Sequence, residues 1–473
     1  MVLGRVADEV ARGVENVMSG ISETLFEPVI RLGVTGLSRA GKTVFITSLV
    51  ANLLDRGRMP QFSPTPRIEA AFLQPQPDDT LPRFDYENHL AALTGEKPHW
   101  PESTRAISEL RLSLRVRPSG FLGGLIGGVT GPRNVHLDIV DYPGEWLLDL
   151  ALLGKSYAEW SDGVLARIAM RPEARDFLAA IQNEDAAALL EEPRAQALAA
   201  AFTRYLVAAR AAGWSDCTPG RFLLPGDLAG SPVLTFAPLA RPESPRRGSL
   251  WREMDRRFEA YKSRVVKPFF RDHFARIDRQ VVLMDVLGAI HAGPQALEDM
   301  RRTMAEVLVA FRPGQNGLLS SLLMGRRVDR ILFAATKADH LHHSQHPRLT
   351  AITQALLRDA QDRAAFAGAA VQAMSLASLR ATVEESRDHR GNRLDLVRGR
   401  LLDGRQAALY PGDLPEDPGQ VLGPARAGAP RWLDADYSVM SFAPAPLVLK
   451  PGLGPPHIRL DRAAEFLLAD RLS

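Results

Sequence analysis

The chain has 473 residues, which is too long for one compact core, so two or three structural units are expected. Apolar residues make up 45% and charged residues 24%, as in ordinary globular proteins, and 58 Lys and Arg against 55 Asp and Glu leave a net charge of +3. This balance gives no basis for nucleic-acid binding. With Cys217 as its one cysteine, the chain cannot form an intrachain disulfide, and we expect a cytoplasmic location.

The first 28 residues predict an amphipathic helix. Apolar residues recur at steps of three or four, at Val6, Val10, Val14, Val17, Ile21 and Leu25. The segment lacks the apolar centre of a signal peptide, and no apolar run of about 18 residues occurs that could span a membrane. The helix could dock on the body of the protein or lie against a membrane surface or partner.

From Val29 onward, strands alternate with helices, which is typical of a mainly parallel sheet. Residues 29–35 predict a buried strand and 42–55 a helix, and residues 107–116 and 134–141 predict two more strands. The segment 57–103 is rich in proline and weakly periodic. The segment FLGGLIGGVTG (121–131) predicts a mobile hairpin tip, with a membrane wedge as the alternative. A hairpin there would make one edge strand antiparallel.

The rest of the chain predicts a helical insertion, the second half of the sheet and a C-terminal extension. Helical periodicity dominates residues 146–278 and ends in a long basic helix over 250–277. Strands are predicted at 280–290, at 369–375 and at 438–444, a strand and loop at 330–339, and a closing helix at 461–472. We therefore expect an N-terminal helix (1–28), a core in two parts (29–144 and 279–380), a helical insertion (145–278) and a C-terminal extension packed on the core (381–473).

The segment GLSRAGKT (36–43) has the form G-x-x-x-x-G-K-T and stands between a predicted strand and a predicted helix. Its glycines let backbone N–H groups face phosphate oxygens at a helix N-terminus. Lys42 would supply charge to the β- and γ-phosphates, and the Thr43 hydroxyl would bind Mg²⁺. The residues expected to contact the nucleotide here are Gly36, Ser38, Arg39, Ala40, Gly41, Lys42, Thr43 and Val44.

The segment DYPGEW (141–146) follows a predicted strand and contains D-x-x-G. Asp141 is expected to hold Mg²⁺ through water, and Gly144 to donate its N–H to the γ-phosphate and begin a switch segment. Glu145 stands where many GTPases carry a glutamine that orients the attacking water. Its charge repels the phosphoryl group, so slow intrinsic hydrolysis is expected. Thr104 is the candidate switch threonine on Mg²⁺ and the γ-phosphate, with Ser103 as its rival and a simple capping role as the alternative.

The segment Thr336-Lys337-Ala338-Asp339 follows a predicted strand and indicates guanine. Guanine presents N1–H and the N2 amino group side by side, and the Asp339 carboxylate can accept from both. The Lys337 stem would lie over the purine face. Ser375 and Leu376, after the last core strand, are weaker candidates for contact with the base. The histidines of DHLHHSQH (339–346) are interpreted as the start of a helix rather than as zinc ligands.

In the order GLSRAGKT, WPESTR, VHLDIVDYPGEWLLDL, LFAATKADH and PHIRLDRAAEFLL, the sequence resembles the YcjX-like P-loop GTPases of Gram-negative bacteria over nearly the whole chain. The resemblance implies a doubly wound Ras-like GTPase sheet and binding of GTP or GDP with Mg²⁺. It also implies a stress-associated role linked to the phage-shock envelope response, with a membrane-protein partner encoded nearby. Peripheral contact with the inner membrane is a separate expectation.

Arg39 occupies the position at which guanylate-binding proteins, whose loop is similar, carry an internal arginine finger. As a finger, Arg39 would supply the charge that Glu145 lacks, and a homodimer across the nucleotide face would aim it. The alternative is an arginine that faces solvent or pairs with a switch carboxylate. The predicted function is therefore a slow GTPase switch, with Lys42, Arg39, Glu145 and Thr104 as its catalytic residues. A guanine-nucleotide-binding scaffold at the membrane that does not hydrolyse GTP is the rival, and an ATP-dependent enzyme is a third reading.

Overall fold

The structure is a computed structural model that describes residues 27–36, 40–102, 106–117, 132–310, 328–366, 369–389, 391–432 and 437–473. Several predictions fall outside these ranges and stay predictions. They are the N-terminal helix (apart from residues 27 and 28), the glycine-rich segment 121–131, and the residues Ser38, Arg39, Ser103 and Thr104.

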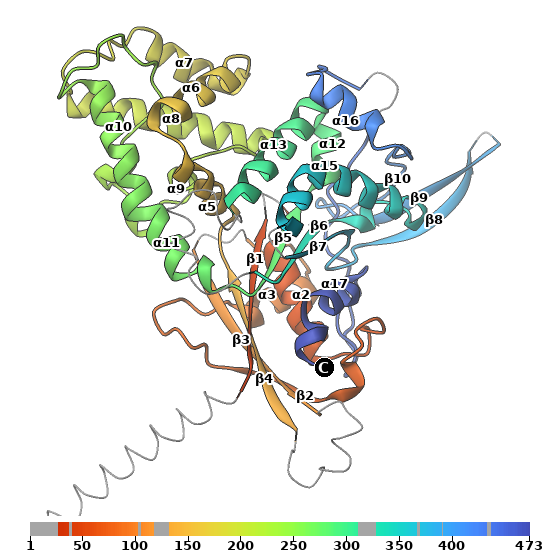
Figure 1. Cartoon of the computed structure of the whole chain (residues 1–473). Coiled ribbons are helices and arrows are strands. Elements are labelled where there is room, and N and C mark those ends of the chain that lie inside the picture. Colours follow the sequence, from red (N-terminus) through yellow and green to blue (C-terminus); the bar gives the residue numbers. More distant parts are fainter. Residues whose placement is uncertain are drawn as a thin grey trace, which may run out of the picture.

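A seven-stranded sheet forms the centre of the described part of the chain (Figure 1), in the order β2-β3-β4-β1-β5-β6-β7. The strands are β1 Val29–Gly36, β2 Ile68–Gln74, β3 Ser108–Val116, β4 Arg133–Asp141, β5 Arg279–Met284, β6 Arg330–Ala335 and β7 Ala370–Ser375. Strands β4, β1, β5, β6 and β7 are parallel, so their carboxyl ends meet at one edge of the sheet. The antiparallel strand is β3, which pairs with both β4 and β2. The prediction that it would be an edge strand is therefore wrong, because β2 covers it.

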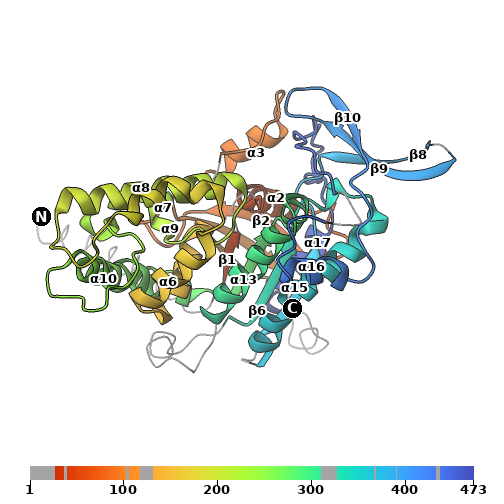
Figure 2. The ribbon, with the colours of Figure 1, turned by 90° about the horizontal axis from the view of Figure 1, so that it is seen from above.

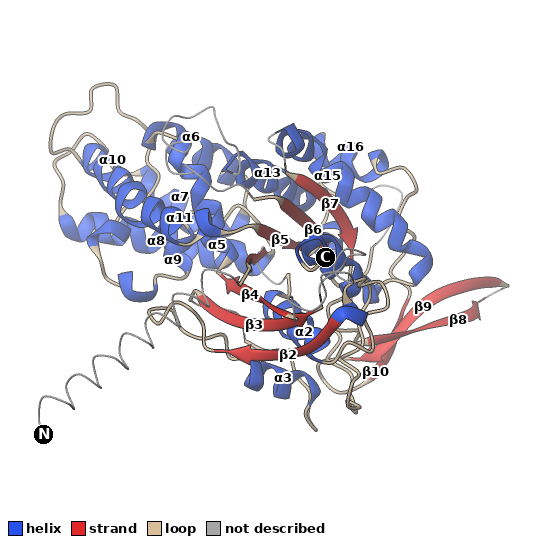
Figure 3. Ribbon diagram, turned by 60° about the horizontal axis from the view of Figure 1, so that its bottom comes forward, coloured by secondary structure: helices blue, strands red, loops and turns tan. Residues whose placement is uncertain are grey.

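Helices cover both faces of the sheet, as the predicted doubly wound fold requires. Alternate strand residues point to opposite faces, so Val281 packs with α2 (Lys42–Leu54) and α17 (Leu460–Leu468) in one core. Its neighbour Val282 packs in a second core with α12 (Val286–Ala292), α13 (Pro294–Ala310) and α15 (His346–Phe366). Figure 3 shows β5 and β6 between α2 on one side and α13 and α15 on the other.

A lobe of helices lies beside the sheet (Figures 1 and 2), between β4 and β5 in the chain. Its helices are α5 Gly144–Leu148, α6 Tyr157–Ile168, α7 Arg175–Gln182, α8 Glu192–Ala212, α9 Gly220–Leu223, α10 Leu250–Tyr261 and α11 Lys267–Asp272. One stripe of α8, at steps of three or four, is buried in the same core as α13 (Ala195, Leu198, Phe202, Tyr205 and Ala209). The lobe is thus continuous with one face of the sheet.

The single helix predicted over 250–277 is interrupted. A π-helical turn at Lys262–Val266 separates α10 from α11. Pro268, near the start of α11, has no N–H to donate to the preceding turn, and a π turn absorbs that lost hydrogen bond. None of the helices in the described ranges is both long and apolar enough to cross a membrane.

The C-terminal extension adds a small second sheet and two helices. This antiparallel sheet has the order β10-β9-β8, with β8 Thr382–His389, β9 Asn392–Arg400 and β10 Gln406–Leu409. Its β8–β9 hairpin projects from the body of the protein (Figure 1). Helix α16 (Gly419–Arg426) contacts α13, and α17 packs under the central sheet.

Three local predictions differ from the structure. The proline-rich segment 57–103 contains β2 and α3 (Tyr86–Thr94), neither of which was predicted. The strand predicted at 280–290 ends at Met284, because Asp285 accepts a hydrogen bond from the Gly288 N–H and begins α12. The strand predicted at 438–444 is reduced to one isolated bridge, between Leu401 and Phe442. Pro444 and Pro446 cannot donate to a ladder there.

Candidate functional site

The phosphate-loop motif lies where β1 meets α2. Gly41 adopts φ 79° and ψ 36°, a left-handed conformation that glycine tolerates, and its carbonyl accepts the first helical hydrogen bond, from the Phe45 N–H at 2.9 Å. Lys42 and Thr43 are the first residues of α2, so they lie at the helix terminus that favours anions. Ala40, Gly41, Lys42, Thr43 and Val44 line a cavity of about 370 Å³, a size typical of small-ligand sites.

The DYPG segment lies directly against this loop. Asp141 ends β4, pairs in register with Val34 of β1 and is 1% exposed. Gly144 approaches β1 so closely that a Cβ built on it would lie 1.7 Å from the carbonyl oxygen of Gly36. Any side chain at position 144 would therefore displace the start of the phosphate loop. Asp141, Gly144 and Gly36 are not among the residues that line the cavity.

Glu145 lines the cavity and is paired with an arginine of the helical lobe. Its Oε1 lies 2.9 Å from Nη2 of Arg210, which is in the last turn of α8 and lines the same cavity. The Glu145 side chain is 7% exposed and that of Arg210 25% exposed. A pair this sheltered is screened by solvent much less than a surface pair. Arg210 therefore offsets the negative charge that Glu145 brings to the cavity.

The base-recognition motif lies at the other end of the cavity. Strand β6 ends at Ala335, and Thr336, Lys337 and Asp339 line the cavity after it. Lys337 has a positive φ of 60° and forms an ion pair with Asp285, the residue that directly follows β5. Asp339 is 4% exposed, and its Oδ2 accepts a hydrogen bond from the Ala381 N–H at 2.9 Å. This bond fixes the orientation of the carboxylate.

In the loop after β7, the residues that line the cavity come directly after the two residues that were predicted to contact the base. Ser375 and Leu376 are fully buried, and the Ser375 carbonyl accepts from Arg459 at 2.7 Å. Leu376 joins the loop to the base-recognition motif, because its carbonyl accepts from the Ala338 N–H at 3.0 Å. The residues of this loop that line the cavity are Ala377, Ser378 and Leu379.

Part of the cavity wall comes from segments without a recognisable motif. Trp100 lines the cavity and donates its indole N–H to the Phe442 carbonyl at 2.7 Å. Pro101 and Glu102 line the cavity beside it, and the C-terminal extension contributes Leu402, Val439, Met440, Ser441 and Phe442. Trp100 stands in the WPESTR block, which was the one available signal. Nothing in the sequence links residues 439–442 to a site whose motifs lie about a hundred or more residues earlier.

Burial changes the titration of two groups beside the site. It raises the pKa of Asp149 to about 7, while hydrogen bonds from Tyr261 and from the Gly220 N–H act in the opposite direction. It lowers the pKa of His340, which follows the base-recognition aspartate, so this imidazole stays neutral near pH 7. Thr43 and Asp141 offer the hydroxyl and carboxylate oxygens that Mg²⁺ prefers, so the residues present fit that ion.

The sheet order, the phosphate loop after β1 and the T-K-x-D motif after β6 together define the α/β fold class of the P-loop, Ras-like GTPases. Comparison with known proteins gives the family. The YcjX-like family, DUF463, matches residues 30–472, and the chain belongs to that family.

Two relatives of this chain are both described as a Ras-like GTPase. The Ras-like GTPase YcjX of Escherichia coli (strain K12) is 38% identical over 463 residues, which cover 94% of this chain and 96% of that protein. The Ras-like GTPase YcjX of Shewanella oneidensis is 35% identical over 471 residues, which cover 94% of each chain.

Proposed function

We propose that this protein binds guanine nucleotide with Mg²⁺, hydrolyses GTP slowly and changes conformation with the state of the nucleotide. The observation that carries the proposal is that Lys42, Glu145 and Asp339 line one cavity although they lie far apart in the sequence. A GTPase needs a phosphate-binding group, a group beside the attacking water and a base-recognition group at these places. The names of both relatives support the same function.

The residues near the bound phosphates would each have a separate role. Lys42 and the N–H groups at the start of α2 would hold the β- and γ-phosphates. Thr43 and Asp141 would hold Mg²⁺, with Thr104 as a third candidate, and the bound ion would supply positive charge that offsets the charge of the phosphate oxygens. Gly144 would donate its N–H to the γ-phosphate.

Arg210 changes what is expected of Glu145. A lone carboxylate near the γ-phosphate would repel it and slow attack by water. The ion pair with Arg210 removes much of that repulsion. We therefore propose Arg210 as the residue that makes Glu145 compatible with hydrolysis, whatever Arg39 contributes.

The proposed switch segment, residues 141–155, contacts the rest of the helical lobe through more than the Glu145–Arg210 ion pair. Asp149 accepts hydrogen bonds from the Gly220 N–H at 2.8 Å and from the Tyr261 hydroxyl. Trp146 lies under the guanidinium of Arg221, with 3.2 Å between the guanidinium carbon and the ring centroid. A movement of residues 141–155 on hydrolysis would therefore pull on α9 and α10. The lobe is proposed to relay the nucleotide state, and residues 57–104 to order together with the switch segment.

Replacing Arg210 by glutamine tests this role. We expect Arg210→Gln to lower the single-turnover rate of GTP hydrolysis by about 10²-fold or more, because the charge of Glu145 is then uncompensated. GDP affinity should change by less than about threefold, because Arg210 is not part of the phosphate loop. Rapid-quench measurements with enzyme in excess give the rate, and calorimetry gives the affinity.

The matched control is Arg204→Gln, an exposed arginine of the same helix. The double variant Arg210→Gln/Glu145→Gln should recover part of the rate if Arg210 acts by neutralising Glu145. Equal single-turnover rates for Arg210→Gln and the wild type would disprove the role. If the wild type itself showed no turnover, the non-hydrolysing scaffold, which the glutamate at position 145 favours, would be the correct function.

The cellular setting is a separate proposal. The family resemblance supports a role in the envelope stress response with a membrane-protein partner. A homodimer across the nucleotide face and a peripheral contact with the inner membrane stay predictions. They depended on Arg39 and on the N-terminal helix, which lie outside the described residues apart from positions 27 and 28.

A further inference from the structure

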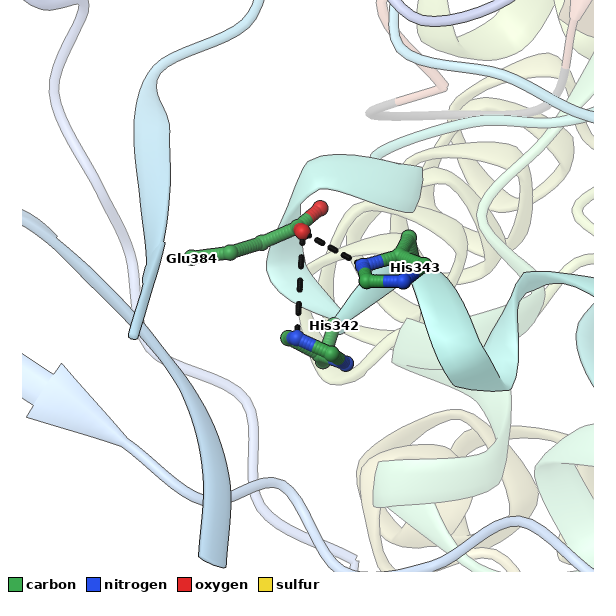
Figure 4. A group of neighbouring side chains, drawn as sticks. All are labelled: His342, His343 and Glu384. Atoms are coloured by element: carbon green, nitrogen blue, oxygen red, sulfur yellow. Dashed lines mark hydrogen bonds and ion pairs between the residues drawn. The ribbon is translucent and has the colours of Figure 1, made fainter. Parts of the chain in front are cut away.

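The histidines that follow the base-recognition motif meet a carboxylate from the C-terminal extension. His342 and His343 begin a short 3₁₀ turn at His343–Gln345, and Glu384 lies on β8, 41 residues further along the chain. Glu384 Oε2 is 2.6 Å from Nδ1 of His343 and 3.8 Å from Nε2 of His342. Figure 4 shows the carboxylate reaching toward both imidazole rings. The sequence alone gave no reason to place a carboxylate there.

We propose that His342, His343 and Glu384 form a binding site for a divalent transition-metal ion, with Zn²⁺ as the favoured occupant. One ligand atom from each residue lies within 4.8 Å of the others. In a tetrahedral zinc site with bonds of about 2.0–2.1 Å, ligand atoms are roughly 3.3 Å apart. Small side-chain rotations would therefore close the three atoms around one ion, and water would complete the tetrahedron.

The groups around the three ligands suit this role. His342 is 11% exposed at its side chain, and its Nδ1 lies 2.9 Å from the Ser344 hydroxyl and 3.5 Å from Asp395 Oδ2. With the metal on Nε2, the proton of His342 would be on Nδ1, where Ser344 and Asp395 can accept it. Nδ1 would then stop accepting from the Ser344 N–H, which is 3.4 Å away. The other Glu384 oxygen, Oε1, lies 3.4 Å from Arg380, which leaves Oε2 for the metal.

The type of donor selects the type of ion. Two imidazole nitrogens and one carboxylate suit Zn²⁺ and its first-row neighbours, whereas Mg²⁺ prefers oxygen ligands only. The site is therefore chemically distinct from the proposed Mg²⁺ site at Thr43 and Asp141.

The position of the site indicates what the ion would do. At the start of β8, the Ala381 N–H and the Thr382 hydroxyl both donate to Asp339, to its carboxylate and to its carbonyl respectively. Glu384 is two residues further along this strand, opposite the two histidines. A bound ion would hold the β8–β9 hairpin against the base-recognition loop. This structural role rests on the proposed function only because that function identifies the loop as the base-recognition loop. The metal site itself can be tested without nucleotide.

The test is a calorimetric titration of Zn²⁺ into chelator-treated, full-length protein without a histidine tag, in excess Mg²⁺. We expect one Zn²⁺ per chain in the wild type. Glu384→Gln and His343→Ala should each weaken binding at least about tenfold, because loss of a ligand costs no less than loss of its supporting hydrogen bonds. The His343 side chain is 68% exposed, so its removal should not impair folding.

Glu385→Gln is the matched control, because the next residue of a strand points to the opposite face. Glu385 pairs there with Arg398 at 3.1 Å, and its variant should bind Zn²⁺ like the wild type. Added Co²⁺ should give the intense visible bands of a tetrahedral site in the wild type and in Glu385→Gln but not in Glu384→Gln. Absence of Zn²⁺ binding in the wild type, or equal binding by Glu384→Gln and Glu385→Gln, would overturn the proposal. GTP binding that persists after either result would leave the proposed function standing.

Discussion

Asp339→Asn is expected to move nucleotide preference from guanosine to xanthosine phosphates. The Ala381 N–H donates to Asp339 Oδ2, so an asparagine would place its carbonyl oxygen toward Ala381 and its NH₂ group toward the base. This amide would oppose the N1–H and amino donors of guanine but would match the oxygen that xanthine carries at that position. Two unpaired donors at about 1–3 kcal/mol each imply a loss of GTP affinity of roughly 10²–10⁴-fold.

Competition between labelled GDP and unlabelled GDP, XDP and ADP measures this preference. Asp227→Asn is a suitable control, because that carboxylate is 90% exposed and lies in the helical lobe. Unchanged preference for GDP in Asp339→Asn would show that the base lies elsewhere, and a preference of the wild type for ADP would favour an ATP-dependent enzyme.

Gly144→Ala is expected to damage both the fold and the phosphate site. The new methyl group would lie 1.7 Å from the Gly36 carbonyl oxygen, and backbone has to move to relieve so short a contact. Overpacking of this kind costs typically 1–3 kcal/mol, and we expect the free energy of unfolding to fall by about 3 kcal/mol. Because Gly36 begins the phosphate loop, GDP should also dissociate at least about tenfold faster.

Denaturant unfolding and stopped-flow release of a fluorescent GDP analogue measure the two effects of this change. Gly163→Ala on α6 is the control, since its new methyl group would meet only a terminal side-chain nitrogen of Arg167, at 3.2 Å, and no backbone of another segment. That variant should be as stable as the wild type or slightly more stable, because alanine favours helix. If Gly144→Ala matched Gly163→Ala in both measurements, the close packing of the switch segment on the phosphate loop would be wrong.

The sequence predicted the parts of the site that depend on local pattern. Lys42 stands in the G-x-x-x-x-G-K-T motif after one predicted strand, and Asp339 stands in the T-K-x-D motif after another. Both residues were therefore expected near the carboxyl ends of strands. The parallel sheet then brings these ends together. The fold class follows from the same alternation of strands and helices, and the structure agrees with it.

The rest of the site depends on contacts between distant segments. Arg210 is 65 residues from Glu145 and belongs to an ordinary amphipathic helix, so no motif marks it. The same holds for the carboxylate of Glu384 beside His342 and His343. Strand β2 was missed because its segment, IEAAFLQ, is only partly buried and has no regular alternation of apolar and polar residues.

The most direct test is phosphate release from GTP by the full-length protein with Mg²⁺, beside ATP as substrate and Lys42→Ala as the inactive variant. We predict slow, saturable release from GTP that GDP inhibits and ADP does not. Release from ATP should not exceed background. Lys42→Ala should lose roughly 10²-fold or more in GDP affinity, because Lys42 is proposed to donate charge-assisted hydrogen bonds to the phosphates. Equal turnover of ATP and GTP, or tight GDP binding by Lys42→Ala, would contradict a guanine-nucleotide switch built on this cavity.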